Sequence, residues 1–163
     1  MPSDARKHSP KPPRILIVDD DAGQRSLLNS FLGSQGFETV PVASGEAALE
    51  ILRTQDISMM ISDVRMPGLS GIDVLREIKK VRADVEVIVI TGYGTLTNAQ
   101  EAIRYGAGDF ISKPFNVADI IAIISKSFER RNYNIKIKSL IQQIKDLRSA
   151  GPMKEECQSQ VTH

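Results

Sequence analysis

The chain alternates between five short apolar segments and longer segments in which apolar residues recur at helical spacing. The short segments lie at residues 15–18, 38–42, 57–62, 85–90 and 110–111, and a helical pattern runs from about residue 117 to residue 148. Strands that are apolar on both faces are typical of a parallel sheet with helices on both sides. The pattern therefore predicts the α/β class, with a doubly wound five-stranded parallel sheet and a C-terminal helical extension.

The distribution of proline and charge predicts four regions along the chain. Residues 1–13 hold four of the eight prolines and no apolar core, so we expect a disordered arm. Residues 14–128 form the compact domain, and residues 129–149 form a helical, coiled-coil-like extension. Residues 150–163 begin at a Gly-Pro pair and are polar, which predicts a disordered tail.

Composition excludes several classes of protein. The 21 basic and 20 acidic residues nearly cancel, and no apolar run approaches the length of a membrane-spanning helix. The N-terminus lacks the apolar core of a secretory signal, so we expect a cytoplasmic protein. Cys157 is the single cysteine, and both histidines lie in the tails, which argues against disulfides and transition-metal sites. Any chemistry at a functional site must therefore use side-chain oxygen atoms and lysine.

Polar residues follow four of the predicted strands at their carboxyl ends: Asp19 and Asp20, Asp63, Thr91, and Lys113. In open α/β sheets ligands bind outside these ends. Carboxylates brought close together repel one another unless a cation compensates, and Mg²⁺ is the hard cation that such oxygen ligands favour. With a lysine and a hydroxyl added, the set is suited to phosphoryl transfer.

Four stretches carry a family resemblance: ILIVDDD at 15–21, SDVRMPGLSGIDVL at 62–75, VIVITG at 87–92 and DFISKPF at 109–115. With them the chain resembles the receiver domains of response regulators in two-component signalling, over about residues 14–128. The resemblance implies a flavodoxin-like fold with strand order 2-1-3-4-5. It also implies a phosphoprotein that a histidine kinase phosphorylates, and no enzyme activity beyond catalysis of its own phosphorylation and dephosphorylation.

The resemblance also implies roles for single residues. Asp63 would be the phosphoacceptor and a Mg²⁺ ligand, together with Asp20 directly, Asp19 through water and the main-chain carbonyl of Arg65. Thr91 and Lys113 would bind phosphoryl oxygens.

Three further expectations follow from the same resemblance. Phe110 takes the place of the family's commoner switch tyrosine and lacks its hydroxyl, and the peptide bond before Pro114 would be cis. Large side chains at Arg65 and Tyr93 would slow loss of the phosphate. The downstream effector, and whether the chain is a piece of a longer regulator, stay open.

Two other functions compete with this interpretation. A haloacid-dehalogenase-like phosphatase also forms an acyl phosphate on aspartate, but its D-x-D-x-[TV] pattern fails because Gly23 occupies the last position. A nucleic-acid-binding protein is the second alternative, because residues 126–148 hold seven basic and two acidic residues, a local charge of +5. Without a helix-turn-helix after this segment, direct nucleic-acid binding is the weaker interpretation.

The C-terminal helix carries an apolar stripe with spacings of 4, 3, 4 and 3 residues: Tyr133, Ile137, Leu140, Ile144 and Leu147. Such a heptad seam predicts a homodimer through a coiled coil that begins near Tyr133. The stripe is shorter than three heptads, so packing within the chain or fraying are alternatives. Earlier in the helix, four isoleucines are expected to face the sheet: Ile120, Ile121, Ile123 and Ile124.

Overall fold

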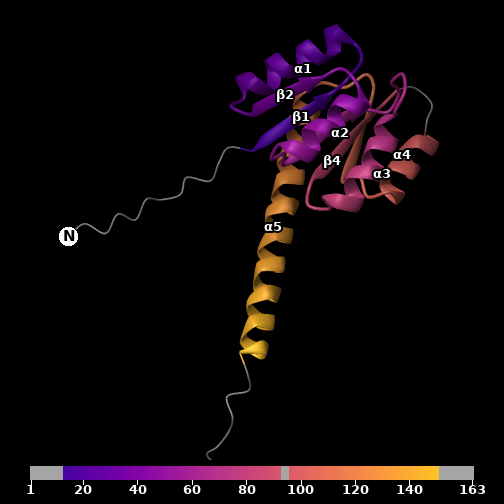
Figure 1. The fold of residues 1–163 in the computed structure, drawn as a ribbon. Coiled ribbons are helices and arrows are strands. Elements are labelled where there is room, and N and C mark those ends of the chain that lie inside the picture. Colours follow the sequence, from indigo (N-terminus) through magenta and orange to yellow (C-terminus); the bar gives the residue numbers. More distant parts are fainter. Residues whose placement is uncertain (1–12, 93–95, 151–163) are drawn as a thin grey trace, which may run out of the picture. The chain divides into compact units, whose positions relative to one another are not determined.

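The computed structural model describes residues 13–92 and 96–150. Five strands form one parallel sheet in the order β2-β1-β3-β4-β5, which confirms the predicted α/β class and strand order (Figure 1). The strands are β1 (Arg14–Val18), β2 (Glu38–Val42), β3 (Met59–Asp63), β4 (Glu86–Thr91) and β5 (Asp109–Ser112).

Helices connect the strands in strict alternation. They are α1 (Ala22–Ser34), α2 (Gly45–Thr54), α3 (Gly71–Val81), α4 (Leu96–Arg104) and α5 (Val117–Ser149). Side chains cap three of them: Asp21 accepts from the Gln24 amide at the start of α1, Ser44 caps α2, and Ser70 forms a capping box at α3. Each cap fixes where a loop at the sheet's carboxyl edge turns into a helix.

The core lies on both faces of the sheet. On one face, Leu16, Met60 and Val87 pack against the apolar sides of α2 and α3, and Figure 1 shows α2, α3 and α4 together on this side. Neighbouring strand residues such as Ile15 and Ile61 are also fully buried. Because successive strand side chains point to opposite faces, burial at both kinds of position means that both faces are covered.

Two strands are shifted along the chain from their predicted bounds by one or two residues, and the first and fifth strands extend one residue beyond theirs. The third strand begins at Met59 rather than Ile57, and the third and fourth strands extend to Asp63 and Thr91. Ile57 is buried but precedes the hydrogen-bonded strand. Its apolar side chain therefore belongs to the core without being part of β3. Asp63 and Thr91 are therefore the last residues of strands, with main chains fixed by the sheet.

The chain divides into two compact units, Met1–Ser127 and Phe128–His163. In the first unit Ile120 and Ile124 on α5 are buried, as predicted, whereas Ile121 and Ile123 are only half-buried. Residues four apart share one face of a helix, which leaves the other two at its margins. The arm and tail predicted to be disordered lie outside the described residues, apart from Pro13 and Ala150. No helix in the described ranges is both long and apolar enough to cross a membrane.

Candidate functional site

Three carboxylates meet at the carboxyl edge of the sheet. Asp19 and Asp20 follow β1 and Asp63 ends β3, and these two strands are neighbours. One oxygen from each of the three carboxylates lies within 4.8 Å of the others. The strand order thus brings together residues that lie more than forty positions apart in the chain.

Asp19 is the most enclosed member of this acidic cluster, with 1% of its surface exposed. Its Oδ1 accepts a hydrogen bond from the Asp21 amide at 2.9 Å, but its buried Oδ2 has no partner among the described residues. Burial raises the pKa of Asp19 above its ordinary value, and repulsion from Asp63 and Asp20 adds to the rise. The Asp21 amide and the Lys113 charge oppose this rise.

Asp63 has partners at both carboxylate oxygens. Lys113 Nζ lies 2.6 Å from Oδ2, and the Arg65 amide donates to Oδ1 at 3.0 Å. Asp63 is 7% exposed, so its charge is held at the edge of the core next to a compact ammonium. One lysine cannot balance three carboxylates, and the cluster keeps an excess of negative charge.

The donor set fits a hard divalent cation. All three side chains offer carboxylate oxygens, one of which is buried without a partner in the described structure. Mg²⁺ is commonly held by one or two carboxylates and retains several waters, and the exposed side chain of Asp20 leaves the cluster open to solvent on one side. The cluster thus agrees with the ligand type that the sequence predicts.

The remaining predicted site residues surround the cluster less closely. Thr91 is buried at the end of β4, and its carbonyl accepts from the Lys113 amide at 2.8 Å. The Lys113-Pro114 peptide bond is cis. The side chain of Arg65 is exposed, and Tyr93 lies outside the described residues.

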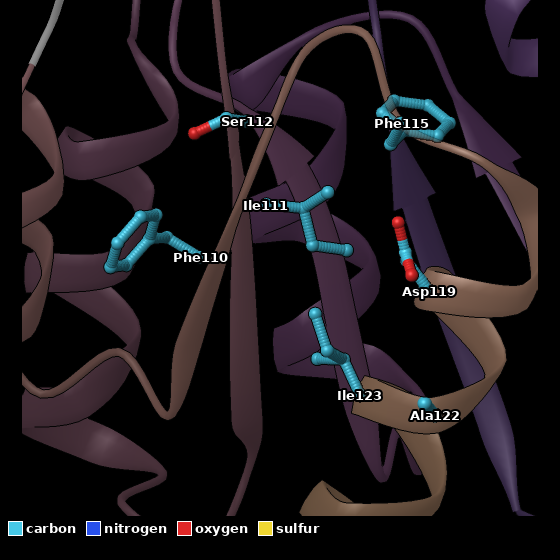
Figure 2. A pocket seen from close by; sticks show the side chains of 7 residues that line it. All are labelled: Phe110, Ile111, Ser112, Phe115, Asp119, Ala122 and Ile123. Carbon is cyan, nitrogen blue, oxygen red and sulfur yellow. The ribbon is translucent and has the colours of Figure 1, made fainter.

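Phe110 is not part of the acidic cluster. It lies on β5 with 36% of its surface exposed, and Figure 2 shows its ring and the Ile111 side chain on opposite sides of the strand. A groove runs beside β5 and the first turns of α5, lined by Phe110, Ile111, Ser112, Phe115, Asp119, Ala122 and Ile123. A ring at this position can change its exposure without breaking a hydrogen bond of its own, because phenylalanine has no polar atom in its side chain.

The structure adds residues that the sequence analysis missed. Arg25 on α1 donates from Nη1 to the Asp19 carbonyl at 2.7 Å. Glu46 on α2 accepts from the Leu69 amide at 3.2 Å and so holds the loop that follows Asp63. Gly71 allows α3 to begin directly against β3, because a Cβ there would collide with the Asp63 carbonyl oxygen. Apolar periodicity carries no signal for such contacts between elements.

Residues 15–125 match the family described as the response regulator receiver domain. Among curated relatives, the transcriptional regulatory protein FixJ of Bradyrhizobium diazoefficiens is 35% identical over 130 residues, which cover 80% of this chain and 63% of FixJ. Sporulation initiation phosphotransferase F of Bacillus subtilis is 35% identical over 69% of this chain and 91% of its own length. The chain spans only 28% of the regulatory protein AtoC of Escherichia coli.

Solved structures show the same fold. A CheY-like receiver domain protein from Methanospirillum hungatei matches with a TM-score of 0.73 and 27% identity, over 76% of this chain and 99% of that one. NtrX from Brucella abortus matches with a TM-score of 0.76 and 31% identity, over 80% of this chain but 30% of its own. These relatives range from proteins of nearly the receiver's length to much longer regulators that contain one.

Proposed function

Because the chain belongs to the response regulator receiver family, we propose that it accepts a phosphoryl group on Asp63 from the phosphohistidine of a histidine kinase. A small donor such as acetyl phosphate would serve in the same way. The observation that carries this proposal is the pairing of Asp63 with Lys113, at 2.6 Å, inside a cluster of carboxylates at the sheet's carboxyl edge.

In the transfer, a carboxylate oxygen of Asp63 forms a bond to phosphorus while the bond from phosphorus to the donor nitrogen breaks. The donor imidazole keeps the electron pair of that bond and leaves as a neutral ring once it carries one proton. Asp63 is suited to this role because its carboxylate is held by Lys113 and by the Arg65 amide in one orientation. Positioning of this kind and charge neutralisation carry most of the catalysis in phosphoryl transfer.

Asp19, Asp20, Asp63 and the Arg65 carbonyl would hold Mg²⁺. When bound, the cation supplies positive charge that offsets the crowded carboxylates and the incoming phosphoryl oxygens. The buried, unpartnered Oδ2 of Asp19 supports this assignment, because such an atom is costly unless a cation or donor meets it. Mg²⁺ also explains how three carboxylates can converge at one edge of the sheet.

The response to phosphorylation is assigned to Thr91, Lys113 and Phe110. Phosphorylation of Asp63 replaces a single carboxylate charge by a phosphoryl group of about two negative charges. Thr91 can donate its hydroxyl and Lys113 its ammonium to the new oxygens, which draws both strand ends inward. The partly exposed ring of Phe110 then changes its packing, and a downstream protein or output domain detects that change.

We also propose that the chain forms a homodimer through Tyr133, Ile137, Leu140, Ile144 and Leu147. Each of these side chains is at least half exposed among the described residues of α5. A partner helix from a second copy would cover this stripe.

The test of the phosphoacceptor is labelling with acetyl phosphate, read on a gel that retards phosphoproteins. Wild-type protein should be labelled with Mg²⁺ and unlabelled with EDTA, and Asp63→Asn should not be labelled. Asp56→Asn is the matched control, because Asp56 precedes the opposite end of β3 and its side chain is 74% exposed. Labelling of Asp63→Asn to the wild-type level would show that the acceptor lies elsewhere.

A further inference from the structure

We infer that Arg25 is a positioning residue for the acidic cluster: it fixes the main chain of Asp19, and through it the orientation in which Asp19 and Asp20 meet Mg²⁺. This inference rests on the proposed function, because it concerns the same metal. Arg25 lies on α1, after Asp19 and Asp20 in the chain, and contributes no carboxylate to the cluster.

The contact on which the inference depends joins Arg25 to the end of β1. Nη1 donates to the Asp19 carbonyl at 2.7 Å across six positions of the chain, and the side chain is half-buried. The Arg25 amide also donates to the Asp21 carbonyl at 2.9 Å, as part of the first turn of α1. A hydrogen bond with a charged donor at this distance is among the stronger ones in proteins.

Three polar atoms of Asp19 are held by three different parts of the structure. Its amide donates to the Val42 carbonyl at 3.2 Å, its carbonyl accepts from Arg25, and its Oδ1 accepts from the Asp21 amide. Only Oδ2 is left without a partner among the described residues, and the Asp19 carboxylate belongs to the acidic cluster. The hydrogen bonds to Asp19 thus leave one oxygen for a cation.

The bond from Arg25 fixes the peptide plane between Asp19 and Asp20, because the peptide group is rigid and planar. A change in the ψ angle of Asp19 would swing this plane and move the Cα of Asp20, whose side chain is exposed. Arg25 binds a main-chain oxygen rather than a carboxylate, so its charge does not replace the cation. Its geometry, and not its charge alone, determines where the ligands lie.

Groups that orient metal ligands are known to matter nearly as much as the ligands themselves, and their loss typically lowers metal affinity by about 10- to 100-fold. We therefore expect Arg25→Ala to raise the dissociation constant for Mg²⁺ about tenfold. Arg25→Lys keeps the charge but lacks the planar fork that places Nη1, so it should also weaken binding several-fold.

The experiment is calorimetric titration of the whole chain with Mg²⁺, together with thermal unfolding of the metal-free protein. Arg53→Ala is the matched control, because Arg53 is an exposed arginine on α2, and it should bind Mg²⁺ like the wild type. A merely structural role would lower the metal-free midpoint of Arg25→Ala and leave its Mg²⁺ affinity within twofold of wild type, which overturns the inference. Wild-type affinity in Arg25→Lys also overturns it, since charge alone would then suffice.

Failure of the inference and failure of the proposed function give different results. If the wild-type chain binds no Mg²⁺, the metal assignment falls and the inference falls with it. If the wild type and Arg25→Ala bind Mg²⁺ equally, only the role of Arg25 is overturned. If Arg25→Ala does not fold, the Arg25→Lys titration still decides between position and charge.

Discussion

Lys113 and Asp63 are fifty positions apart in the chain, yet the Lys113 ammonium lies 2.6 Å from Asp63 Oδ2. The ion pair joins the loop after β5 to the end of β3 across the intervening strand β4. With side chains 25% and 10% exposed, the two charges are only partly screened by water. We therefore expect Lys113 to stabilise the metal-free fold and to compete with a cation for the same carboxylate.

Lys113→Met should lower the stability of the metal-free protein and raise its affinity for Mg²⁺. Without the ammonium, Asp63 loses a half-buried partner, and the metal-free protein should lose about 1–3 kcal/mol of unfolding free energy. The same change removes a positive charge beside the cluster, so Mg²⁺ should bind about fivefold more tightly. Urea unfolding and calorimetric titration measure the two effects.

Lys80→Met is the control for this prediction. Lys80 on α3 pairs with Glu77 at 3.1 Å, but its side chain is 65% exposed. Exposed pairs contribute about 0.5 kcal/mol or less, so neither stability nor Mg²⁺ affinity should change much. If Lys113→Met bound Mg²⁺ more weakly than wild type, the proposed competition between lysine and metal would be wrong.

Asp19→Asn should stabilise the metal-free protein at pH 7. Burial raises the pKa of Asp19 above its ordinary value of 3.8, so between these two values the folded state binds more protons than the unfolded state. Stability due to this group therefore falls as pH rises through that interval, and the ionised carboxylate is the destabilising form. Removing the buried charge should recover about 1–2 kcal/mol, chiefly the cost of burying it, with repulsion from the nearby carboxylates added.

The same substitution should abolish the stabilisation that Mg²⁺ gives to the wild type, because a ligand is lost. In the wild type, Mg²⁺ affinity should weaken as pH falls toward the raised pKa of Asp19, since protonation removes the ligand charge. Asp21→Asn is the control: asparagine caps a helix as well as aspartate does, so both stability and the Mg²⁺ response should persist. Equal Mg²⁺ stabilisation of Asp19→Asn and wild type would remove Asp19 from the metal site.

The sequence pattern was sufficient to predict the parallel sheet and the edge at which Asp19, Asp63 and Lys113 meet, whereas the strand order was implied by the family resemblance. Periodicity identifies strands that are buried on both faces, and parallel connections then place every carboxyl end at one edge. The sequence pattern could not predict the hydrogen bond from Arg25 to the Asp19 carbonyl, or the one from the Leu69 amide to Glu46. These contacts depend on side-chain rotamers and loop geometry, which a pattern of apolar positions does not specify.

Gly71→Ala should destabilise the fold and disturb Asp63. A Cβ at Gly71 would collide with the Asp63 carbonyl oxygen and lie 2.8 Å from Ser62 Oγ, so α3 or β3 must move. We expect a loss of about 2–3 kcal/mol, as for other overpacked sites, together with slower phosphorylation. Chemical denaturation and labelling with acetyl phosphate provide the two measurements.

Gly33→Ala is the matched control for that substitution. Gly33 lies in α1, and a Cβ there meets nothing within 4 Å. Alanine favours the helix over glycine by up to about 1 kcal/mol, so this variant should be as stable as wild type or more stable. A similar loss of stability in both variants would show that the close approach to Asp63 is not the cause.

The apolar stripe of α5 should make the protein a dimer. In the heptad repeat, Ile137 and Ile144 occupy a positions, and Leu140 and Leu147 occupy d positions. Isoleucine at a with leucine at d favours a parallel coiled coil of two helices. Leu140 is 50% exposed and Leu147 is 75% exposed, so each has apolar surface left to bury. Ile141, 47% exposed, lies next to the seam and widens it.

Analytical ultracentrifugation tests this seam by substitution and by shortening the chain. Leu140→Asp places a charge in the seam and removes a leucine worth about 1.5–3 kcal/mol on burial, so the dimer's dissociation constant should rise at least tenfold. Gln142→Asp, two residues further and on the opposite side of the helix, should leave the dimer intact. A chain that ends at Arg131 should sediment as a monomer. If the full and shortened chains are both monomers, or are dimers of equal strength, the stripe is not the dimerising element.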